Sequence, residues 1–216
     1  MARSSVARCG LVAALVVVAL AVAMPGYSVN AATTDPWPGQ AAVPGDVTTL
    51  PVGGKWVAYE PDPGTTSSES AAAAGLVHPV EHACPSGTTN YPAAKRAYNC
   101  LSTYHDNGNK GHSVGLRQGR TGSSAFGYLH ALQDHGLDEQ SIGTVIVNNA
   151  AGISQGNSRY LYGLRYEVND VGILAVEVIE DRKPSSASPD SYKLGVVTAY
   201  CKGYTKCPAG VNASLP

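Results

Sequence analysis

The stretch that decides the fold is residues 159–181, which read RYLYGLRYEVNDVGILAVEVIED. From Tyr160 to Val168, apolar and aromatic side chains alternate with polar ones, a period of two that is typical of a strand with one buried face. Turn-forming residues follow at 169–172, and the apolar run 174–179 predicts a second strand. Two strands joined by a tight turn form an antiparallel hairpin, so this stretch predicts the centre of an antiparallel sheet.

Further elements are expected on both sides of this hairpin. After a loop over 184–190, residues 194–200 predict a third strand. Helices followed by consecutive strands are typical of an α+β fold, here with N-terminal helices packed on a small antiparallel β-meander. The expected helices are residues 91–104, then Ser123 or Ser124 to about His135 with Gly136 at its end, then one capped by Asp138 with Ile142, Val145 and Ile146 on its apolar face.

The first 31 residues have the pattern of a secretory signal peptide. Arg3 and Arg8 precede an apolar run from Gly10 to Met24, and small residues at 29–31 suit cleavage before Ala32. The apolar run is shorter than the roughly 20 residues that a membrane-spanning helix needs. The sequence therefore predicts a secreted, extracellular protein with no membrane span after cleavage.

The remaining chain divides by composition into a linker and one domain. Residues 32–77 are rich in Pro, Ser, Thr and Ala, which is typical of a disordered linker, and residues 78–216 are expected to form a single domain. Without the signal peptide, 13 basic residues face 16 acidic ones, a net charge of about −3. This balance argues against a protein that holds nucleic acid by its overall charge, so nucleic-acid chemistry would need a local site.

Export accounts for the cysteines. Once the signal peptide and Cys9 are removed, four cysteines remain, an even number that suits an oxidising compartment. Of the three pairings, we favour Cys84–Cys100 and Cys201–Cys207, because the chain keeps each pair close and turn-forming residues lie beside them. A zinc site is the rival interpretation, but the spacing of the last pair is poor for a metal and no histidine lies nearby. We expect neither a metal nor a cofactor.

The densest set of polar candidates lies between His112 and His135. One run reads His112-Ser-Val-Gly-Leu-Arg117-Gln-Gly, and a second reads Phe126-Gly-Tyr-Leu-His130-Ala-Leu-Gln-Asp-His135-Gly136. Together with the later strand 195–200, these runs resemble nuclease domains of bacterial polymorphic toxins of the barnase–EndoU–colicin–RelE type. The resemblance covers roughly residues 112–205, and most members of that group are ribonucleases that need no metal.

The resemblance implies cleavage of RNA by transesterification, in which one group takes the proton of the 2′-hydroxyl and another protonates the leaving 5′-oxygen. Histidine suits both transfers, and arginine suits the charged phosphate. It also implies RNA as the substrate and an immunity protein as a partner. The residues carried over are His130 and His135 for proton transfer, Arg117 and Thr198 for the phosphate, and Arg120, His112 and Tyr200 for substrate binding.

Three other functions compete with this one. The first is a non-enzymatic, disulfide-stapled binding or envelope-associated domain. The second is an ADP-ribosyltransferase-like toxin built from Arg117, the Ser-rich run 121–124 and either Glu177 or Glu180. The third is a metal site formed by His130, Asp134 and His135. A ribonuclease requires His130, Arg117 and Thr198 to meet in one cleft, whereas a binding domain does not.

Overall fold

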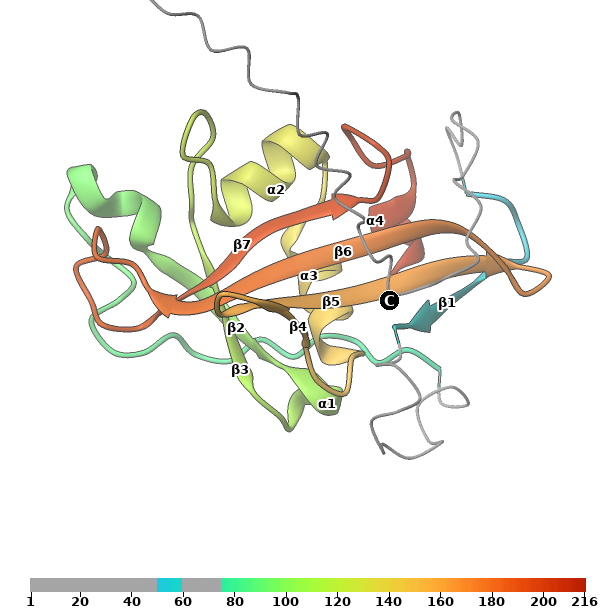
Figure 1. Cartoon of the computed structure of the whole chain (residues 1–216), viewed down its shortest axis with the longest axis horizontal. Helices are drawn as coiled ribbons and strands as arrows, with labels where there is room; N and C mark the ends of the chain where they lie inside the picture. The colour runs from blue at the N-terminus through green and yellow to red at the C-terminus, as the bar shows by residue number, and fades with distance from the viewer. Residues whose placement is uncertain (1–49, 60–74) are drawn as a thin grey trace, which may run out of the picture. The chain divides into compact units, whose positions relative to one another are not determined.

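The computed structural model describes residues 50–59 and 75–216, so the expected signal peptide and most of the expected linker lie outside the described residues. The described part has an α+β fold with two antiparallel sheets (Figure 1). The larger sheet has the order β1-β5-β6-β7, with β4 paired to β5, and the smaller sheet is the hairpin β2–β3. The strands are β1 (Lys55–Ala58), β2 (Cys100–His105), β3 (Ser113–Arg117), β4 (Ile153–Gly156), β5 (Arg159–Val168), β6 (Val171–Pro184) and β7 (Lys193–Cys201).

The meander β5–β6–β7 confirms the prediction made from the alternating residues. Asn169 and Asp170 form the two-residue turn between β5 and β6, with φ angles of 51° and 62°. Positive φ at both positions is the backbone that a type I′ hairpin turn requires, and Asn and Asp tolerate it. Strand β6 extends beyond the expected 174–179 because it pairs with β5 on one side and with β7 on the other.

The core lies on one face of this sheet. Tyr162 and Leu164 on β5 stand opposite Val178 and Val176 on β6, and all four are fully buried. Helix α3 (Glu139–Val147) packs against both strands. As predicted, Asp138 caps this helix, because its carboxylate accepts a hydrogen bond from the backbone N–H of Ser141 at 2.8 Å.

The expected helix over 91–104 is wrong. A short 3-10 helix, η1 (Ala93–Tyr98), is followed by strand β2, which pairs with β3. The first four residues of η1, Ala93 to Arg96, are exposed, so they offer no apolar face for a longer helix. Along β2, Ser102 and Tyr104 alternate inward. The hairpin β2–β3 thus replaces the first of the three expected helices.

The second helix is present but starts later than expected. Helix α2 (Gly127–His135) follows Phe126, and Ser123 and Ser124 lie in the preceding turn without capping it. Its end is as predicted, since Gly136 takes the left-handed conformation with φ of 77°. Helix α2 packs along β7 (Figure 1). Two four-residue helices, α1 (Asp106–Asn109) and α4 (Val211–Ser214), complete the elements.

Strand β1 lies within the segment that was expected to be a linker. Lys55–Ala58 pair with β5, and Tyr59 packs with Leu161 and Ala175 on the face opposite the core. The hydrophobic cluster Trp56-Val57-Ala58-Tyr59 therefore contributes a strand to the larger sheet.

Both expected disulfides are present, Cys84–Cys100 and Cys201–Cys207. The first joins the start of β2 to the segment before η1, and the second closes a short loop directly after β7. Among residues 50–59 and 75–216, we find no helix of the length and hydropathy needed to cross a membrane.

A contact between two backbones sets how the smaller sheet meets the larger one. Gly195 on β7 has φ of 80°, and a side chain there would overlap the carbonyl oxygen of Gly115 on β3. Only glycine combines this backbone conformation with such a close approach. The approach brings β3 against β7, and both strands carry residues of the candidate sites.

We predict that Gly195→Ala lowers the free energy of unfolding by at least about 2 kcal/mol, since the new methyl group meets backbone and the φ angle is strained. Gly115→Ala is the matched control, because a methyl group there meets open space. It should change stability by no more than about 1 kcal/mol. Urea unfolding of both variants makes the comparison, and equal effects would contradict the proposed close approach.

Candidate functional site

The structure separates the candidate residues into two groups. The first group, on α2 and along β7, contains His130, His135, Thr198 and Tyr200, and the second, on and before β3, contains His112 and Arg117. Arg120 belongs to neither group and lies in the turn before α2, where its side chain bonds the Ser124 carbonyl and covers the Phe126 ring. The expected meeting of His130, Arg117 and Thr198 in one cleft is not observed, because Arg117 is held by Asp190 in the second group. Any ribonuclease site on α2 and β7 would therefore have to work without Arg117.

The histidine cluster consists of His130, Asp134, His135, Tyr200 and Glu177. The imidazole rings of His130 and His135 meet edge to face, with centroids 4.8 Å apart. His135 in turn lies 6.0 Å from the ring of Tyr200 on β7. The two histidines come from one helix, α2, which packs against this strand.

Each imidazole is held through its Nδ1 atom. His130 Nδ1 lies 2.7 Å from the carboxylate of Asp134, one helical turn later, and His135 Nδ1 lies 3.0 Å from the Thr205 carbonyl oxygen. Because a carbonyl or carboxylate oxygen only accepts, each Nδ1 carries the hydrogen. The neutral ring then presents an unprotonated Nε2, and in the described part of the chain no residue hydrogen-bonds to either Nε2 atom.

A tyrosine and a glutamate continue the cluster across the sheet. The Tyr200 hydroxyl donates to Glu177 at 2.6 Å, and the Tyr59 hydroxyl donates to the other oxygen of the same carboxylate at 3.0 Å. Burial, and then the contact with Glu177, raises the pKa of Tyr200 well above its ordinary value, so this phenol stays protonated. Thr198 lies two residues before Tyr200 and shares its face of β7.

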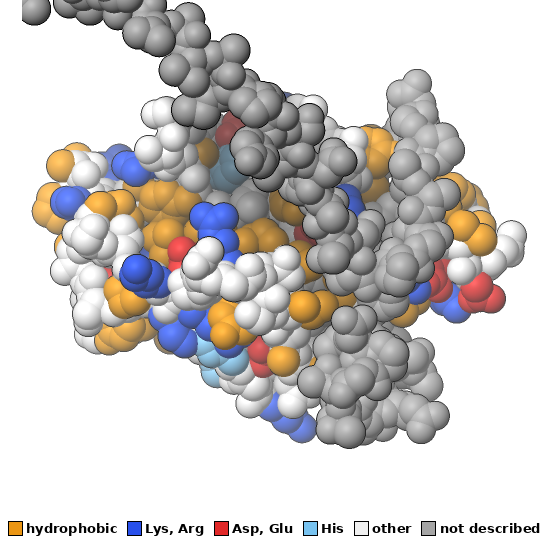
Figure 2. All heavy atoms as spheres, in the orientation of Figure 1, with side chains coloured by type: hydrophobic (Ala, Val, Ile, Leu, Met, Phe, Trp, Pro, Cys, Tyr) orange, Lys and Arg blue, Asp and Glu red, His pale blue; other side chains and the backbone are white. Residues whose placement is uncertain are grey.

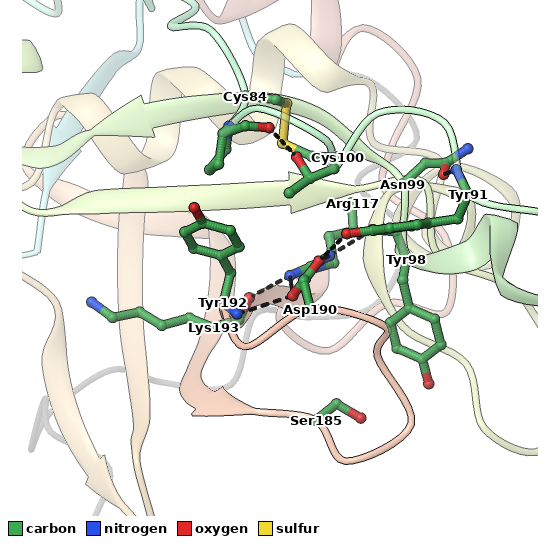
Figure 3. A network of polar contacts seen from close by, with 12 residues as sticks. Cys84, Tyr91, Tyr98, Asn99, Cys100, Arg117, Ser185, Asp190, Tyr192 and Lys193 are labelled. Atoms are coloured by element: carbon green, nitrogen blue, oxygen red, sulfur yellow. Dashed lines mark hydrogen bonds and ion pairs between the residues drawn. A yellow bond between two sulfur atoms is a disulfide. The ribbon is translucent and has the colours of Figure 1, made fainter.

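Arg117 is buried and committed to structural contacts. It is 3% exposed, and its guanidinium forms a two-pronged pair with Asp190, at 2.9 Å to each carboxylate oxygen (Figure 3). The same group donates to the carbonyl oxygens of Tyr98 and Lys193 at 2.6 and 3.0 Å. These contacts fasten β3 to the loop between β6 and β7, so Arg117 has a structural role in this arrangement.

The Asp190 carboxylate accepts hydrogen bonds from several donors. Beside Arg117, it accepts from the Tyr91 hydroxyl at 2.6 Å and from the backbone N–H of Tyr192 at 3.0 Å. Burial alone would raise the pKa of this carboxyl, but the hydrogen bonds from Arg117 and Tyr91 outweigh it and lower the pKa below 3.8.

His112 belongs to a second polar network, built around a fully buried carboxylate. Its Nε2 lies 2.9 Å from Glu180, which is 0% exposed and also accepts from Tyr162 at 3.1 Å and from Arg182 at 2.9 Å. Asp106 accepts from the His112 backbone N–H at 2.6 Å, and burial raises the pKa of that aspartate. A buried carboxylate with this many donors is paired rather than free, so Glu180 holds His112 in place.

A pocket of about 420 Å³ lies between these two networks and the Cys84–Cys100 disulfide. Its walls come from both strands of the smaller sheet, the segment before η1 and the start of β7. Across from the disulfide are Tyr192 and Lys193 (Figure 3). The sequence interpretation missed Asp190, Tyr192 and Lys193, because they follow a loop rich in Ser and Pro and their partners lie far away in the chain.

Two of the competing sites are not supported by this geometry. In the described ranges, no group of three or more His, Cys, Asp and Glu residues is arranged to hold a metal ion, and this includes the set His130, Asp134 and His135. For an ADP-ribosyltransferase, the Ser-rich run 121–124 forms a bend and turn instead of a strand. Glu177 and Glu180 also lie on opposite faces of β6.

Comparison of the chain with protein-family models, with curated proteins and with solved structures finds no match.

We predict that Asp190→Asn lowers the free energy of unfolding by about 3 kcal/mol at pH 7, because it leaves the Arg117 charge buried without a partner. Folding lowers the pKa of Asp190, so its contribution is present above pH 3.8 and is lost as the pH falls below that value. The stability gap between wild type and variant should accordingly shrink in acid.

The control for this prediction is Asp170→Asn, which removes an exposed pair with Lys55 at 2.9 Å. Exposed ion pairs contribute little to stability, so the free energy of unfolding of this variant should stay close to that of the wild type at every pH tested. Denaturant unfolding from pH 7 down to pH 3 tests both. A gap for Asp190→Asn that did not change with pH would rule out the ion pair as its source.

Proposed function

We propose that the protein is an endoribonuclease that works outside the cytoplasm and cleaves RNA by transesterification at the histidine cluster, without a metal. The observation that carries the proposal is the contact between His130 and His135, each held through Nδ1 and each presenting Nε2. Two adjacent imidazoles can supply the base and the acid that this reaction needs. The choice of RNA as substrate follows from the resemblance of the surrounding motifs.

In the proposed reaction, His130 acts as the base. Its Nε2 takes the proton of the ribose 2′-hydroxyl, whose oxygen attacks the phosphorus and forms a 2′,3′-cyclic phosphate. Protonated His135 gives its proton to the leaving 5′-oxygen as the phosphorus–oxygen bond breaks. Asp134 fixes the tautomer of His130, as a carboxylate does for the base in other acid–base pairs. In the proposal, Thr198 on the adjacent strand contacts the phosphate and Tyr200 contacts a base.

The charge on the surface gives independent support for a polyanionic substrate. Basic side chains gather on the half of the molecular face that holds η1 and the loop between β6 and β7 (Figure 2). Arg117 is neutralised by Asp190, so it adds nothing to this patch. A local basic patch attracts RNA even where the net charge is slightly negative. The exposed basic residues of η1 and of the strand ends beside the β6–β7 loop are Lys95, Arg96, Lys183 and Lys193.

The two disulfides favour an oxidising compartment, in agreement with the secretion expected from the signal-like N-terminus. A secreted ribonuclease would threaten the cell that makes it. An immunity protein in that cell is accordingly part of the proposal.

We predict that the oxidised protein cleaves a labelled RNA in EDTA and leaves 2′,3′-cyclic phosphate ends. His130→Ala and His135→Ala should each reduce the cleavage rate by a factor of about 10² to 10⁴, the usual contribution of a positioned acid or base. Gel analysis identifies the product ends, and the cleavage rate is measured from samples quenched at successive times.

His78→Ala serves as the matched control, because His78 is exposed and lies outside the histidine cluster. It should cleave like the wild type, and circular dichroism should show all three variants folded. Absence of cleavage by folded wild-type protein would reject the ribonuclease and favour the disulfide-stapled binding domain.

A further prediction concerns Asp134, which acts on the reaction only through His130. Asp134→Ala should lower kcat by about tenfold while KM stays nearly constant, because the ring loses the partner that sets its tautomer. Asp134 is partly exposed, so the fold should survive the change. A kcat equal to wild type, or a loss confined to KM, would show that this carboxylate does not position the base.

A further inference from the structure

The pocket beside the smaller sheet has the size and lining of a ligand site. Its volume of about 420 Å³ falls in the range of sites that hold small ligands. The lining combines apolar surface with four hydroxyl groups, from Thr88, Thr103, Ser113 and Ser191. Thr88 and Thr103 already donate to backbone carbonyl groups, so their hydroxyl oxygens can act only as acceptors toward a further partner.

Lys193 supplies a positive charge to this pocket. Of the two cationic residues in the lining, Arg117 is paired with Asp190, whereas no carboxylate of the described residues forms an ion pair with Lys193. The Lys193 ammonium lies 3.4 Å from Nδ1 of His112. Because an ammonium only donates, Nδ1 accepts, and Nε2 of His112 carries the hydrogen toward Glu180. The buried glutamate thereby positions the lysine through the imidazole.

Tyr192 supplies an aromatic surface next to this charge. Its side chain is 49% exposed, although its backbone is anchored by the hydrogen bond to Asp190. A half-exposed ring on an anchored backbone is suited to stacking against a flat ligand.

We propose that this pocket binds one nucleotide, with its phosphate on Lys193 and its base against Tyr192. An aromatic face, an adjacent cation and a set of hydroxyl groups match the base, phosphate and ribose of a nucleotide. An inorganic anion would need the lysine alone and would leave the tyrosine and the apolar wall unused. The proposal rests on the ribonuclease function in one respect, that the nucleotide belongs to the RNA substrate.

The pocket is then a substrate subsite remote from the bond that breaks. Lys193 begins β7 and Tyr200 lies near its end, so the two are separated by roughly 23 Å of strand at about 3.3 Å per residue. A nucleotide in the pocket is several positions along the chain from the one at the histidine cluster. Occupation of this subsite should tighten the binding of long RNA and leave the chemistry of a short substrate unchanged.

The test is calorimetric titration of the oxidised protein with the four nucleoside 3′-monophosphates, with the nucleosides and with inorganic phosphate. We expect at least one nucleotide to bind more tightly than its nucleoside and than phosphate. Lys193→Gln should weaken the binding of that nucleotide by about tenfold, since a charge-assisted contact is lost. Tyr192→Ala should weaken it at least about fivefold, and Tyr192→Phe should restore it, because stacking needs only the ring.

Lys110→Gln is the matched control, since it removes one exposed positive charge outside the pocket. It should bind nucleotides like the wild type. If Lys193→Gln and Lys110→Gln lost the same nucleotide affinity, the loss would reflect the protein's overall charge, and the proposed site would be overturned. The same conclusion would follow if no nucleotide bound, or if Tyr192→Ala bound as tightly as wild type.

Binding and cleavage are measured separately, so the two proposals fail in different ways. His130→Ala should retain nucleotide binding while it loses cleavage. Cleavage without nucleotide binding would overturn the subsite alone. Nucleotide binding without any cleavage would overturn the ribonuclease and leave a nucleotide-binding domain. With both intact, Lys193→Gln should raise KM for a long RNA about five- to tenfold, and by a clearly larger factor than it raises KM for a dinucleotide.

Discussion

The ion pair between Arg117 and Asp190 is the interaction on which the arrangement of the described domain depends. It joins residues 73 positions apart in the chain and fastens the smaller sheet to the loop that leads into β7. Asp190 at the same time holds the backbone of Tyr192, and Arg117 holds the carbonyl of Lys193. Without this pair, a buried guanidinium would lose its counter-charge and the wall of the pocket would lose its anchor. Arg117, which the motif resemblance assigned to the phosphate, thus serves to position Tyr192 and Lys193, two residues of the pocket wall.

The parts of the fold that could be predicted from sequence are those specified by neighbours in the chain. Alternation over ten residues identified β5, an Asn-Asp turn identified the hairpin, and the carboxylate of Asp138 identified the start of α3. The expected helix over 91–104, where the structure has η1 and β2, shows the limit of prediction from neighbours in the chain. Side chains at 98, 101 and 104 fit a helical period, but the strand is stabilised by pairing with β3, which no local pattern reveals. Tertiary pairing outweighed local preference there.

The candidate sites show the same division. His130 and Asp134 are four residues apart on one helix, so their spacing predicted that they share a face, whereas the contact of His130 with His135, five residues later, does not follow from helical spacing. Arg117, His112 and Lys193 could not be related in this way, because their partners come from a distant loop and from β6. The face of β6 on which a residue lies also decides which partners its side chain contacts. Glu177 contacts two tyrosines on one side, whereas Glu180 is enclosed with His112 and Arg182 on the other. Their odd spacing along β6 puts the two glutamates on opposite faces, but only the pairing of the strands decides which partners each face meets.

The loop closed by Cys201 and Cys207 has one further consequence. The carbonyl that holds the His135 ring belongs to Thr205, inside that loop, and the backbone N–H of Cys207 donates to the His135 carbonyl oxygen at 2.9 Å. The orientation of one imidazole is therefore tied to a covalent bond that thiols can break. In a reducing environment the loop loses its closure, and the two rings lose part of the support that keeps them together. The redox state of the surroundings is in this way linked to the geometry of the histidine pair.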